Sequence, residues 1–166
     1  MTNASNETLI DLIYAEARHL DEQRWEEWLD LYLPDAVFWV PAWKDDHVPT
    51  SDPSREVSLI YACGRNRLEE RVKRATGTKS LASQPLPRTM HCITNPLVAR
   101  DDSTDAWIVR SYCVTHVYDL RTEALRTSAA RYEHTLLMRN GLPRIARKKA
   151  LLINDKVPTV LDFYCI

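Results

Sequence analysis

The sequence predicts an α+β domain in which helices come first and a curved antiparallel sheet follows. Residues 5–32 carry apolar side chains at helical spacing, whereas residues 88–154 are typical of long strands. A second observation is the dipeptide Asn140-Gly141, which accepts the positive φ angles of a type I′ hairpin turn. Helices followed by an uninterrupted run of strands indicate an α+β arrangement and not alternating β/α units.

The hairpin around Asn140-Gly141 is the expected centre of the sheet. Side chains along residues 130–139 alternate between two faces. One face carries Tyr132, His134, Leu136 and Met138. The return strand, 144–153, ends in four consecutive apolar residues, so both of its faces should be buried there. Because a hairpin this long is marginal alone, we expect neighbouring strands and a helix across its apolar face.

Two helices are predicted between residues 5 and 32. Ser5 or Asn6 can cap the first, which should end near Leu20, and Asp21 is expected to cap the second. The second helix has a dense apolar stripe at helical spacing, made of Trp25, Trp28, Leu29 and Tyr32. Such a stripe could be a ligand platform. We interpret it as core that fills the curve of the sheet, because each buried Trp removes roughly 150–250 Å² from water.

Short elements and a long loop connect these helices to the sheet. Residues 37–40 and 57–61 are predicted as short strands, and residues 66–76 as a third helix closed by Gly77. The basic face of this helix is interpreted as solvated, with phosphate or an acidic partner as the alternative. The loop over residues 41–55 contains Trp43, which either packs back on the domain or anchors an interface. The sequence leaves both roles for Trp43 open.

From residue 88 to residue 154 the chain is predicted to form a meander of four long antiparallel strands. The first two strands cover residues 89–99 and 106–118, and the hairpin supplies the other two. Consecutive strands of this kind usually pair as neighbours. We therefore expect one sheet whose order largely follows the chain.

Composition and charge exclude several classes of partner. The net charge is −1, which gives no electrostatic case for nucleic acid or an anionic membrane. No apolar run approaches the roughly 20 residues of a membrane span, and residues 1–6 lack the features of a signal peptide. The four cysteines are scattered, so we expect reduced thiols. A cytoplasmic location is the resulting expectation.

Two fragments of the sequence suggest metal ligands but do not make a site. Cys113 and His116 have half of the spacing of a Rieske iron–sulfur ligand set, and His91-Cys92 is an adjacent pair. Residues separated by one or three positions on a strand point to opposite faces, so neither pair can converge on one ion. We therefore expect no metal in this chain. There is also no nucleophile elbow and no phosphate-binding glycine loop.

A proton-transfer site is harder to exclude from sequence. It needs one carboxylate or histidine with a shifted pKa in an apolar pocket, together with a tyrosine donor. His134 with Tyr132 could serve, with Asp35 or Glu133 as further candidates. We favour the other interpretation, in which His134 is a core histidine with a hydrogen-bond partner.

Several segments resemble the small (β) subunit of aromatic-ring-hydroxylating dioxygenases, particularly the benzoate and anthranilate branch. The matching segments are Asp35-Ala36-Val37-Phe38-Trp39-Val40-Pro41-Ala42-Trp43, Ser58-Leu59-Ile60-Tyr61, Leu68-Glu69-Glu70-Arg71-Val72, Pro87-Arg88-Thr89-Met90-His91 through Asn95, Arg147-Lys148-Lys149-Ala150-Leu151-Leu152-Ile153-Asn154-Asp155 and Val160-Leu161-Asp162-Phe163-Tyr164. The resemblance covers nearly the whole chain. One departure is Leu142-Pro143, where many members of the family have an aromatic residue after the turn.

The resemblance implies a fold, a function and partners. The fold would be an NTF2-like (cystatin-like) cone formed by residues 1–166 as one domain, with a strongly curved antiparallel sheet wrapped around the N-terminal helices. The chain would be a non-catalytic, structural subunit that assembles with a larger α subunit, three copies of each. The Rieske [2Fe-2S] cluster and the mononuclear non-haem iron would lie in the α subunit. The implied reaction is NADH- and O₂-dependent dihydroxylation of an aromatic carboxylate.

The alternative is a free-standing NTF2-like dehydratase or isomerase that uses its own cone cavity. Its candidate cavity residues would be Asp35, Tyr132 and His134. Such an enzyme should be active as a particle of this chain alone, whereas a dioxygenase β subunit needs a second, larger chain.

The C-terminal tail, residues 155–166, is unusually apolar for a chain end. It carries Leu161, Phe163, Tyr164 and Ile166. Chain ends are usually mobile and polar, and a contiguous apolar patch generally marks an interface. We therefore expect these four side chains to pack at a subunit boundary, against a second copy of this chain or the α subunit.

Overall fold

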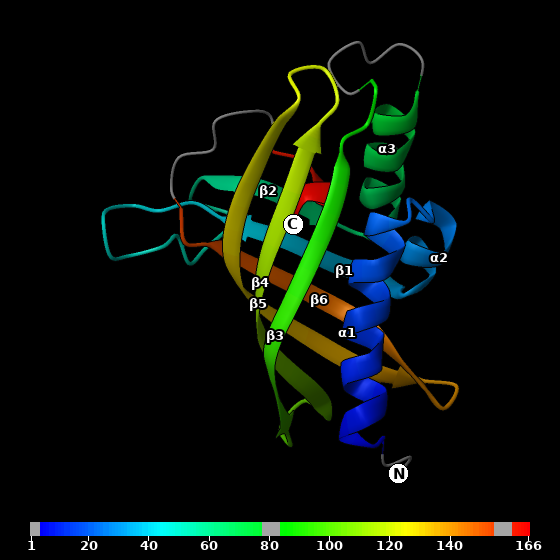
Figure 1. Ribbon diagram of the computed structural model, residues 1–166. Helices are drawn as coiled ribbons and strands as arrows, with labels where there is room; N and C mark the ends of the chain where they lie inside the picture. The colour runs from blue at the N-terminus through cyan, green and yellow to red at the C-terminus, as the bar shows by residue number, and fades with distance from the viewer. Residues whose placement is uncertain (1–3, 78–83, 155–160) are drawn as a thin grey trace.

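The computed structural model describes residues 4–77, 84–154 and 161–166, and the statements below concern those residues. The chain folds into three helices, one six-stranded sheet and a C-terminal 3₁₀ turn (Figure 1). In chain order the elements are α1 (Asn6–Asp21), α2 (Trp25–Asp30), β1 (Tyr32–Pro41), β2 (Ser58–Cys63), α3 (Arg65–Thr76), β3 (Arg88–Asp101), β4 (Ala106–Asp119), β5 (Ala124–Arg139), β6 (Leu142–Leu152) and η1 (Phe163–Cys165).

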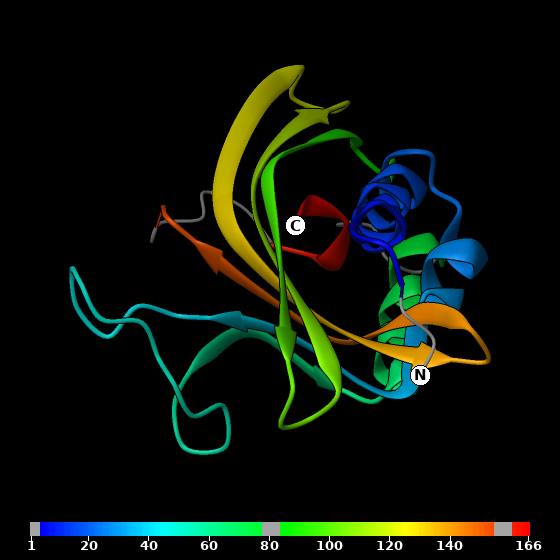
Figure 2. The same cartoon turned by 90° about the horizontal axis from the view of Figure 1, so that it is seen from below.

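The strands form one curved sheet in the order β2-β1-β6-β5-β4-β3. The four long strands pair in sequence as an antiparallel meander, as predicted. One expectation needs correction, because β1 runs parallel to β6 and the sheet is therefore mixed. Figure 2 shows the sheet curling around η1, with the helices closing the open side of the curve. The α+β class and the strongly curved sheet are thus confirmed.

The predicted hairpin turn is present between β5 and β6. Asn140 has a φ of 52° and Gly141 a φ of 79°, so both central residues have the positive φ that a type I′ turn requires. The turn sets the register that pairs Tyr132 with Ala150 and His134 with Lys148. This register decides which side chains enter the concave interior.

The first helix has the predicted boundaries, but the second is shorter than expected. Ser5 caps α1, since its hydroxyl oxygen accepts a hydrogen bond from the Thr8 N–H. Asp21 does not cap α2. Its carboxylate is instead bound to β3, where it accepts hydrogen bonds from Thr89 Oγ1 at 2.8 Å and from His91 N at 2.9 Å. None of the described helices has the length and apolarity needed to cross a membrane.

The third helix differs from prediction at its ends. It begins at Arg65, one residue before the predicted start, directly after Gly64, which has a φ of 92°. Gly77 has an extended backbone with a φ of −73° and does not use the left-handed conformation expected of a glycine at this position. The helix packs on β1 and β2 through Leu68, Val72 and Ala75.

The core lies between the concave face of the sheet and the helices. Trp28 is fully buried, and its ring lies 5.1 Å from that of Tyr32 and 5.0 Å from that of Phe163, between centroids. Trp25, in contrast, is only partly buried. The interpretation of the Trp-rich segment as core is therefore confirmed for Trp28. The ring of Phe163 comes from the other end of the chain and completes the aromatic cluster.

Replacing Trp28 with Ala should destabilise the fold through the cavity that it leaves. We expect a loss of roughly 3–5 kcal/mol in the free energy of unfolding, measured by urea denaturation of the purified chain. The yield of assembled complex should fall, whereas the specific activity of the complex that does assemble should change little. Normal stability together with lost turnover would mean that Trp28 is not a core residue.

Candidate functional site

A buried ion pair occupies the interior of the cone. Lys148 Nζ on β6 lies 2.9 Å from both carboxylate oxygens of Glu16 on α1. The same Glu16 carboxylate accepts hydrogen bonds from Trp28 Nε1 at 2.9 Å and from Tyr32 OH at 2.8 Å. Glu16 and Lys148 are both 0% exposed. Burial of two charges is tolerated here because each charge has an opposite partner and further hydrogen bonds.

The buried surroundings of Glu16 lower the pKa of its carboxyl group. Burial by itself would raise the pKa, but the positive charge of Lys148, the neighbouring His134 ring and the hydrogen bonds from Trp28 and Lys148 lower it to about 2. Burial and the nearby Glu16 carboxylate raise the pKa of Tyr32 well above its ordinary value. At neutral pH Glu16 is therefore a carboxylate and Tyr32 is a protonated phenol.

His134 lies in the same interior and is neutral. It is 0% exposed, and burial together with the positive charge of Lys148 lowers its pKa to about 3. Its Nε2 is 3.9 Å from Glu16 Oε2, too far for a hydrogen bond. The prediction of a core histidine is confirmed, but neither ring nitrogen has a hydrogen-bond partner among the described residues.

The structure brings together only two of the predicted cavity residues. The rings of Tyr132 and His134 lie 5.8 Å apart, but the residues are only 2% and 0% exposed. Asp35 is exposed on β1, and Glu133 lies on the outer face of the sheet, where it binds Arg110. The structure therefore does not bring the four predicted acid–base residues together, and the two that are neighbours, Tyr132 and His134, are buried.

The C-terminal segment fills the cone and is held there by the ion pair. Lys148 Nζ donates a hydrogen bond to the Ile166 carbonyl oxygen at 3.0 Å, and the Asp162 carboxylate caps η1 by accepting from Phe163 N at 2.8 Å. Phe163, Tyr164 and Ile166 are buried within their own chain. These three side chains therefore do not form the exposed apolar surface on which their predicted interface role rested. Leu161 is half-buried, and residues 155–160 lie outside the described residues.

The sequence allows two roles for Trp43, and in the structure its ring is bound to the domain. Its Nε1 donates a hydrogen bond to the Leu152 carbonyl oxygen at 2.8 Å, at the end of β6. The backbone of Trp43 also forms an isolated bridge with Pro49. This contact supports the alternative in which Trp43 packs back on its own chain.

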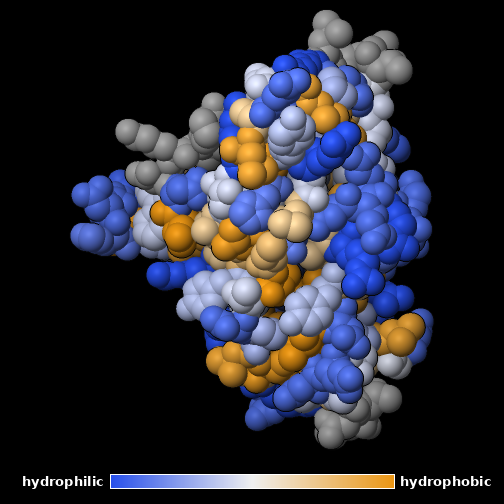
Figure 3. All heavy atoms as spheres, viewed as in Figure 1, coloured by the Kyte–Doolittle hydropathy of each residue, from blue (hydrophilic) through white to orange (hydrophobic). Residues whose placement is uncertain are grey.

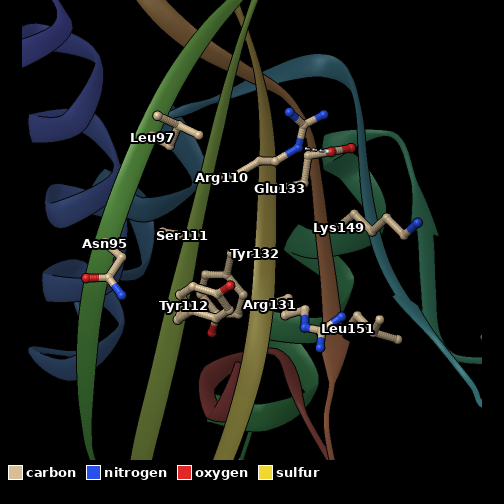
Figure 4. Close-up of a pocket in the computed structure, with 10 residues that line it drawn as sticks. All are labelled: Asn95, Leu97, Arg110, Ser111, Tyr112, Arg131, Tyr132, Glu133, Lys149 and Leu151. Carbon is tan, nitrogen blue, oxygen red and sulfur yellow. Dashed lines mark hydrogen bonds and ion pairs between the residues drawn. The ribbon is translucent and has the colours of Figure 1, made fainter. Parts of the chain in front are cut away.

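The outer face of the sheet carries a groove that the sequence did not reveal (Figure 4). It has a volume of about 370 Å³ and runs across β3, β4, β5 and β6. Its lining residues are Asn95, Leu97, Arg110, Ser111, Tyr112, Arg131, Tyr132, Glu133, Lys149 and Leu151. At its β3 side the strand register shifts between Thr94 and Leu97, where Asn95 has a φ of 52°. This bulge changes the direction of β3 beside the groove.

The groove has the composition of a contact surface. Leu97 is 66% exposed and Tyr112 is 52% exposed. Tyr112 is paired in register with Arg131, and Arg110 Nε lies 2.9 Å from Glu133 Oε2 in the neighbouring pair. Figure 3 shows apolar atoms gathered over this face. Tyrosine and arginine surrounding apolar residues are typical of the centre of protein interfaces.

Alternation along a strand predicts which side chains of β5 lie on the outer face of the sheet. The groove also depends on how four strands are aligned with one another, which alternation does not predict. Because side chains alternate along a strand, Arg131 and Glu133 are expected on the face opposite His134, and they lie there. No local pattern predicts that Leu97 and Leu151 join them, because these residues are 54 positions apart. Strand pairing alone brings them together.

The cysteine and histidine side chains that suggested metal ligands point in the directions that strand alternation predicts. Cys113 is buried, whereas His116 Nδ1 shares a hydrogen bond with Thr127 Oγ1 on the exposed side of the sheet. His91 Nδ1 donates to Asp21 Oδ1 at 2.6 Å. The described residues contain no group of three or more ligating side chains that could hold a metal ion.

Comparison with known proteins identifies the family. The model of the family described as "Ring hydroxylating beta subunit" matches residues 15–159. The chain belongs to this family. It is 37% identical to toluate 1,2-dioxygenase subunit beta of Pseudomonas putida, covering 96% of this chain and 97% of the relative. It is 36% identical to benzoate 1,2-dioxygenase subunit beta of Acinetobacter baylyi, covering 98% of this chain and 94% of that relative.

Solved structures agree with the membership in the ring hydroxylating beta subunit family. The beta subunit of benzoate 1,2-dioxygenase from Burkholderia mallei superposes with a TM-score of 0.81 over the whole of both chains, at 31% identity. A chain of naphthalene 1,2-dioxygenase has the same fold, with a TM-score of 0.75 at 18% identity, covering 95% of this chain and 85% of that chain. A further structural neighbour is described as having a cystatin-like fold, so the predicted fold class is confirmed.

Breaking the buried ion pair should destabilise this β subunit strongly. Lys148→Met leaves the Glu16 carboxylate buried without its cation, and we expect a loss of about 3–5 kcal/mol in unfolding free energy. The matched control is Lys149→Met on the neighbouring outward-facing position, which should change stability far less. The double variant Glu16→Leu/Lys148→Met should lose less than the sum of the single variants. Additive losses in urea unfolding would contradict the pairing.

Stability should fall as the pH is lowered through the mildly acidic range. His134 has a folded pKa of about 3, below its ordinary value of 6.5, so the unfolded chain binds a proton that the folded chain excludes. The resulting stability is fully present above pH 6.5 and is lost between pH 6.5 and pH 3. The slope from one such proton approaches about 1.4 kcal/mol per pH unit.

The test compares melting temperatures between pH 5 and pH 8 in two variants. His134→Gln should reduce the pH dependence, because the titrating group is absent. His47→Gln, at an exposed loop position, is the matched control and should keep the wild-type dependence. Identical pH curves for wild type and His134→Gln would contradict a buried neutral histidine.

Proposed function

We propose that this chain is the non-catalytic, structural β subunit of a multicomponent ring-hydroxylating dioxygenase that acts on an aromatic carboxylate. The observation that carries the proposal is the match over nearly the whole chain to small subunits named for toluate, benzoate, halobenzoate and anthranilate dioxygenases, at 34–37% identity. All four substrates in these names are benzoate-like acids. The chain would serve an NADH- and O₂-dependent oxidoreductase without performing the chemistry itself.

The interior of the cone supports a structural role. A free-standing dehydratase or isomerase needs a cavity that admits its substrate. Here the interior holds Phe163, Trp28 and the buried Glu16–Lys148 pair. The tyrosine and histidine that could transfer protons are enclosed. The space that such an enzyme would use for catalysis is used for packing.

The iron chemistry belongs, in this proposal, to a larger α subunit. A Rieske [2Fe-2S] cluster and a mononuclear non-haem iron in that subunit would supply electron transfer and oxygen activation. The candidate ligands of this chain do not fit either group, because Cys113 faces the interior while His116 faces outward. Residues of this chain would act by holding the larger subunit in its assembled form.

Assembly with the α subunit and with further copies of this chain, three of each, is the proposed quaternary state, in the cytoplasm. The outer groove around Tyr112 and Arg131 is a suitable contact surface for such neighbours. Its exposed apolar side chains would lose water on contact, and its charged rim would fix orientation.

Co-expression with a larger α subunit tests this function. The two chains should purify as one particle, and light scattering should give the mass of three copies of each. Dihydroxylation of benzoate-like acids, assayed with NADH and an electron-transfer component, should require both chains. Iron should be well below one atom per chain in the isolated β subunit and present in the complex. Isolated chain that catalyses a dehydration or isomerisation at full rate would refute the structural role.

A further inference from the structure

Strand β2 leaves one edge of the sheet open. It pairs with β1 only, so its other side presents backbone N–H and C=O groups that no described strand pairs. At the opposite edge, Asp21 covers part of β3 by accepting the His91 N–H. Natural proteins usually block edges with charges or prolines. The β2 strand, Ser58–Cys63, contains neither.

The outward face of this edge is apolar and exposed. Val57 is 73% exposed, Leu59 is 39% exposed and Tyr61 is 44% exposed, and Cys63 continues the same alternation. The residues between them, such as Ile60 at 2%, point into the core. The solvent face of an antiparallel sheet normally carries polar side chains. An apolar stripe along an open edge therefore indicates a surface that a partner covers.

Helix α3 places arginine side chains next to the β2 edge. A groove of about 510 Å³ lies between β2 and α3, lined by Tyr61 and Cys63 on one side and by Arg67, Arg71 and Arg74 on the other. Two of these arginines are compensated, since Arg67 lies 3.0 Å from Glu70 and Arg71 lies 3.6 Å from Asp162.

The third arginine is the uncompensated charge of the groove. Arg74 forms no ion pair with any residue that the structure describes, and its side chain is exposed. The groove therefore has an excess of positive charge next to an apolar strand. This combination selects an occupant that carries carboxylates and apolar side chains together.

We propose that the β2 edge and α3 form a docking groove for an extended acidic segment of the larger subunit, which adds to the sheet as a seventh strand; the proposal rests on the function proposed above. Backbone hydrogen bonds to β2 would give affinity, as in other cases of strand addition. Alternate side chains of the added strand would cover Leu59 and Tyr61. Its carboxylates would pair with Arg74 and compete for Arg67.

Hydrogen–deuterium exchange on the isolated chain and on the assembled complex tests the added strand. The amides of residues 58–63 should exchange at least about tenfold more slowly in the complex, because half of them gain a backbone acceptor. Unchanged exchange there in a fully assembled complex would overturn the proposal and leave the proposed function intact. Protection that appears in the isolated chain on self-association would also overturn it, because the occupant would then be a second copy.

Charge and edge variants test the chemistry of the occupant. In binding measurements with the larger subunit, Arg74→Glu should weaken association by about tenfold, and more so at low salt. Lys73→Glu is the matched control, since it makes the same charge change on the same helix outside the groove. Leu59→Lys should also weaken association, whereas Leu142→Lys, at a 54% exposed position on the hairpin, should not.

The pattern of outcomes separates this inference from the function on which it rests. Weakening by Arg74→Glu and Leu59→Lys with both controls unaffected supports an acidic strand in the groove. Equal effects of Arg74→Glu and Lys73→Glu would show only a general dependence on charge and would overturn it. If the wild-type chain fails to bind the larger subunit at all, the proposed function fails and this inference fails with it.

Discussion

The ion pair between Glu16 and Lys148 is the interaction on which the rest of this structure depends. It joins the first helix to the last strand, and the same ammonium group holds the carbonyl oxygen of Ile166. Helix, sheet and C-terminal segment therefore meet at one buried point. Two charges at 0% exposure are costly to bury, so each must be satisfied for the fold to be stable. The arrangement also favours one register, because a slip of one residue would move Lys148 to the solvent face.

Filling the cone has a functional consequence. A curved sheet around a cavity can host catalysis, but here the aromatic rings of Trp28 and Phe163 stack 5.0 Å apart inside the curve of the sheet. The interior contributes stability, and the surfaces that remain for function are on the outside. Two candidates among the described residues are the groove around Tyr112 and the edge at β2. Both carry exposed apolar side chains next to arginines, as expected of a chain that works by contact with other subunits.

Family membership and the physical features of the chain both agree with an interior that stabilises the fold and an outer surface that makes contacts. The chain belongs to the ring hydroxylating beta subunit family and matches small subunits over nearly their full length. Its candidate sulfur and imidazole ligands lie on opposite faces of strands. On the proposed structural role, substitutions in its core should change stability, and substitutions on its outer surface should change association with other subunits.

Local chemistry in the sequence determined the secondary structure and the meander. Asn140-Gly141 accepts positive φ in any context, Ser5 caps whatever helix follows it, and strand alternation assigned His134 to the interior. Tertiary structure decided where distant residues meet. The sequence predicts Asp21 as a helix cap, but its carboxylate accepts a hydrogen bond from β3. It predicts Phe163 as an interface residue, but the ring is buried within its own chain. Helix capping and strand alternation act within a few residues, whereas Glu16 and Lys148 are separated by 132 positions and find each other only once the sheet has curved.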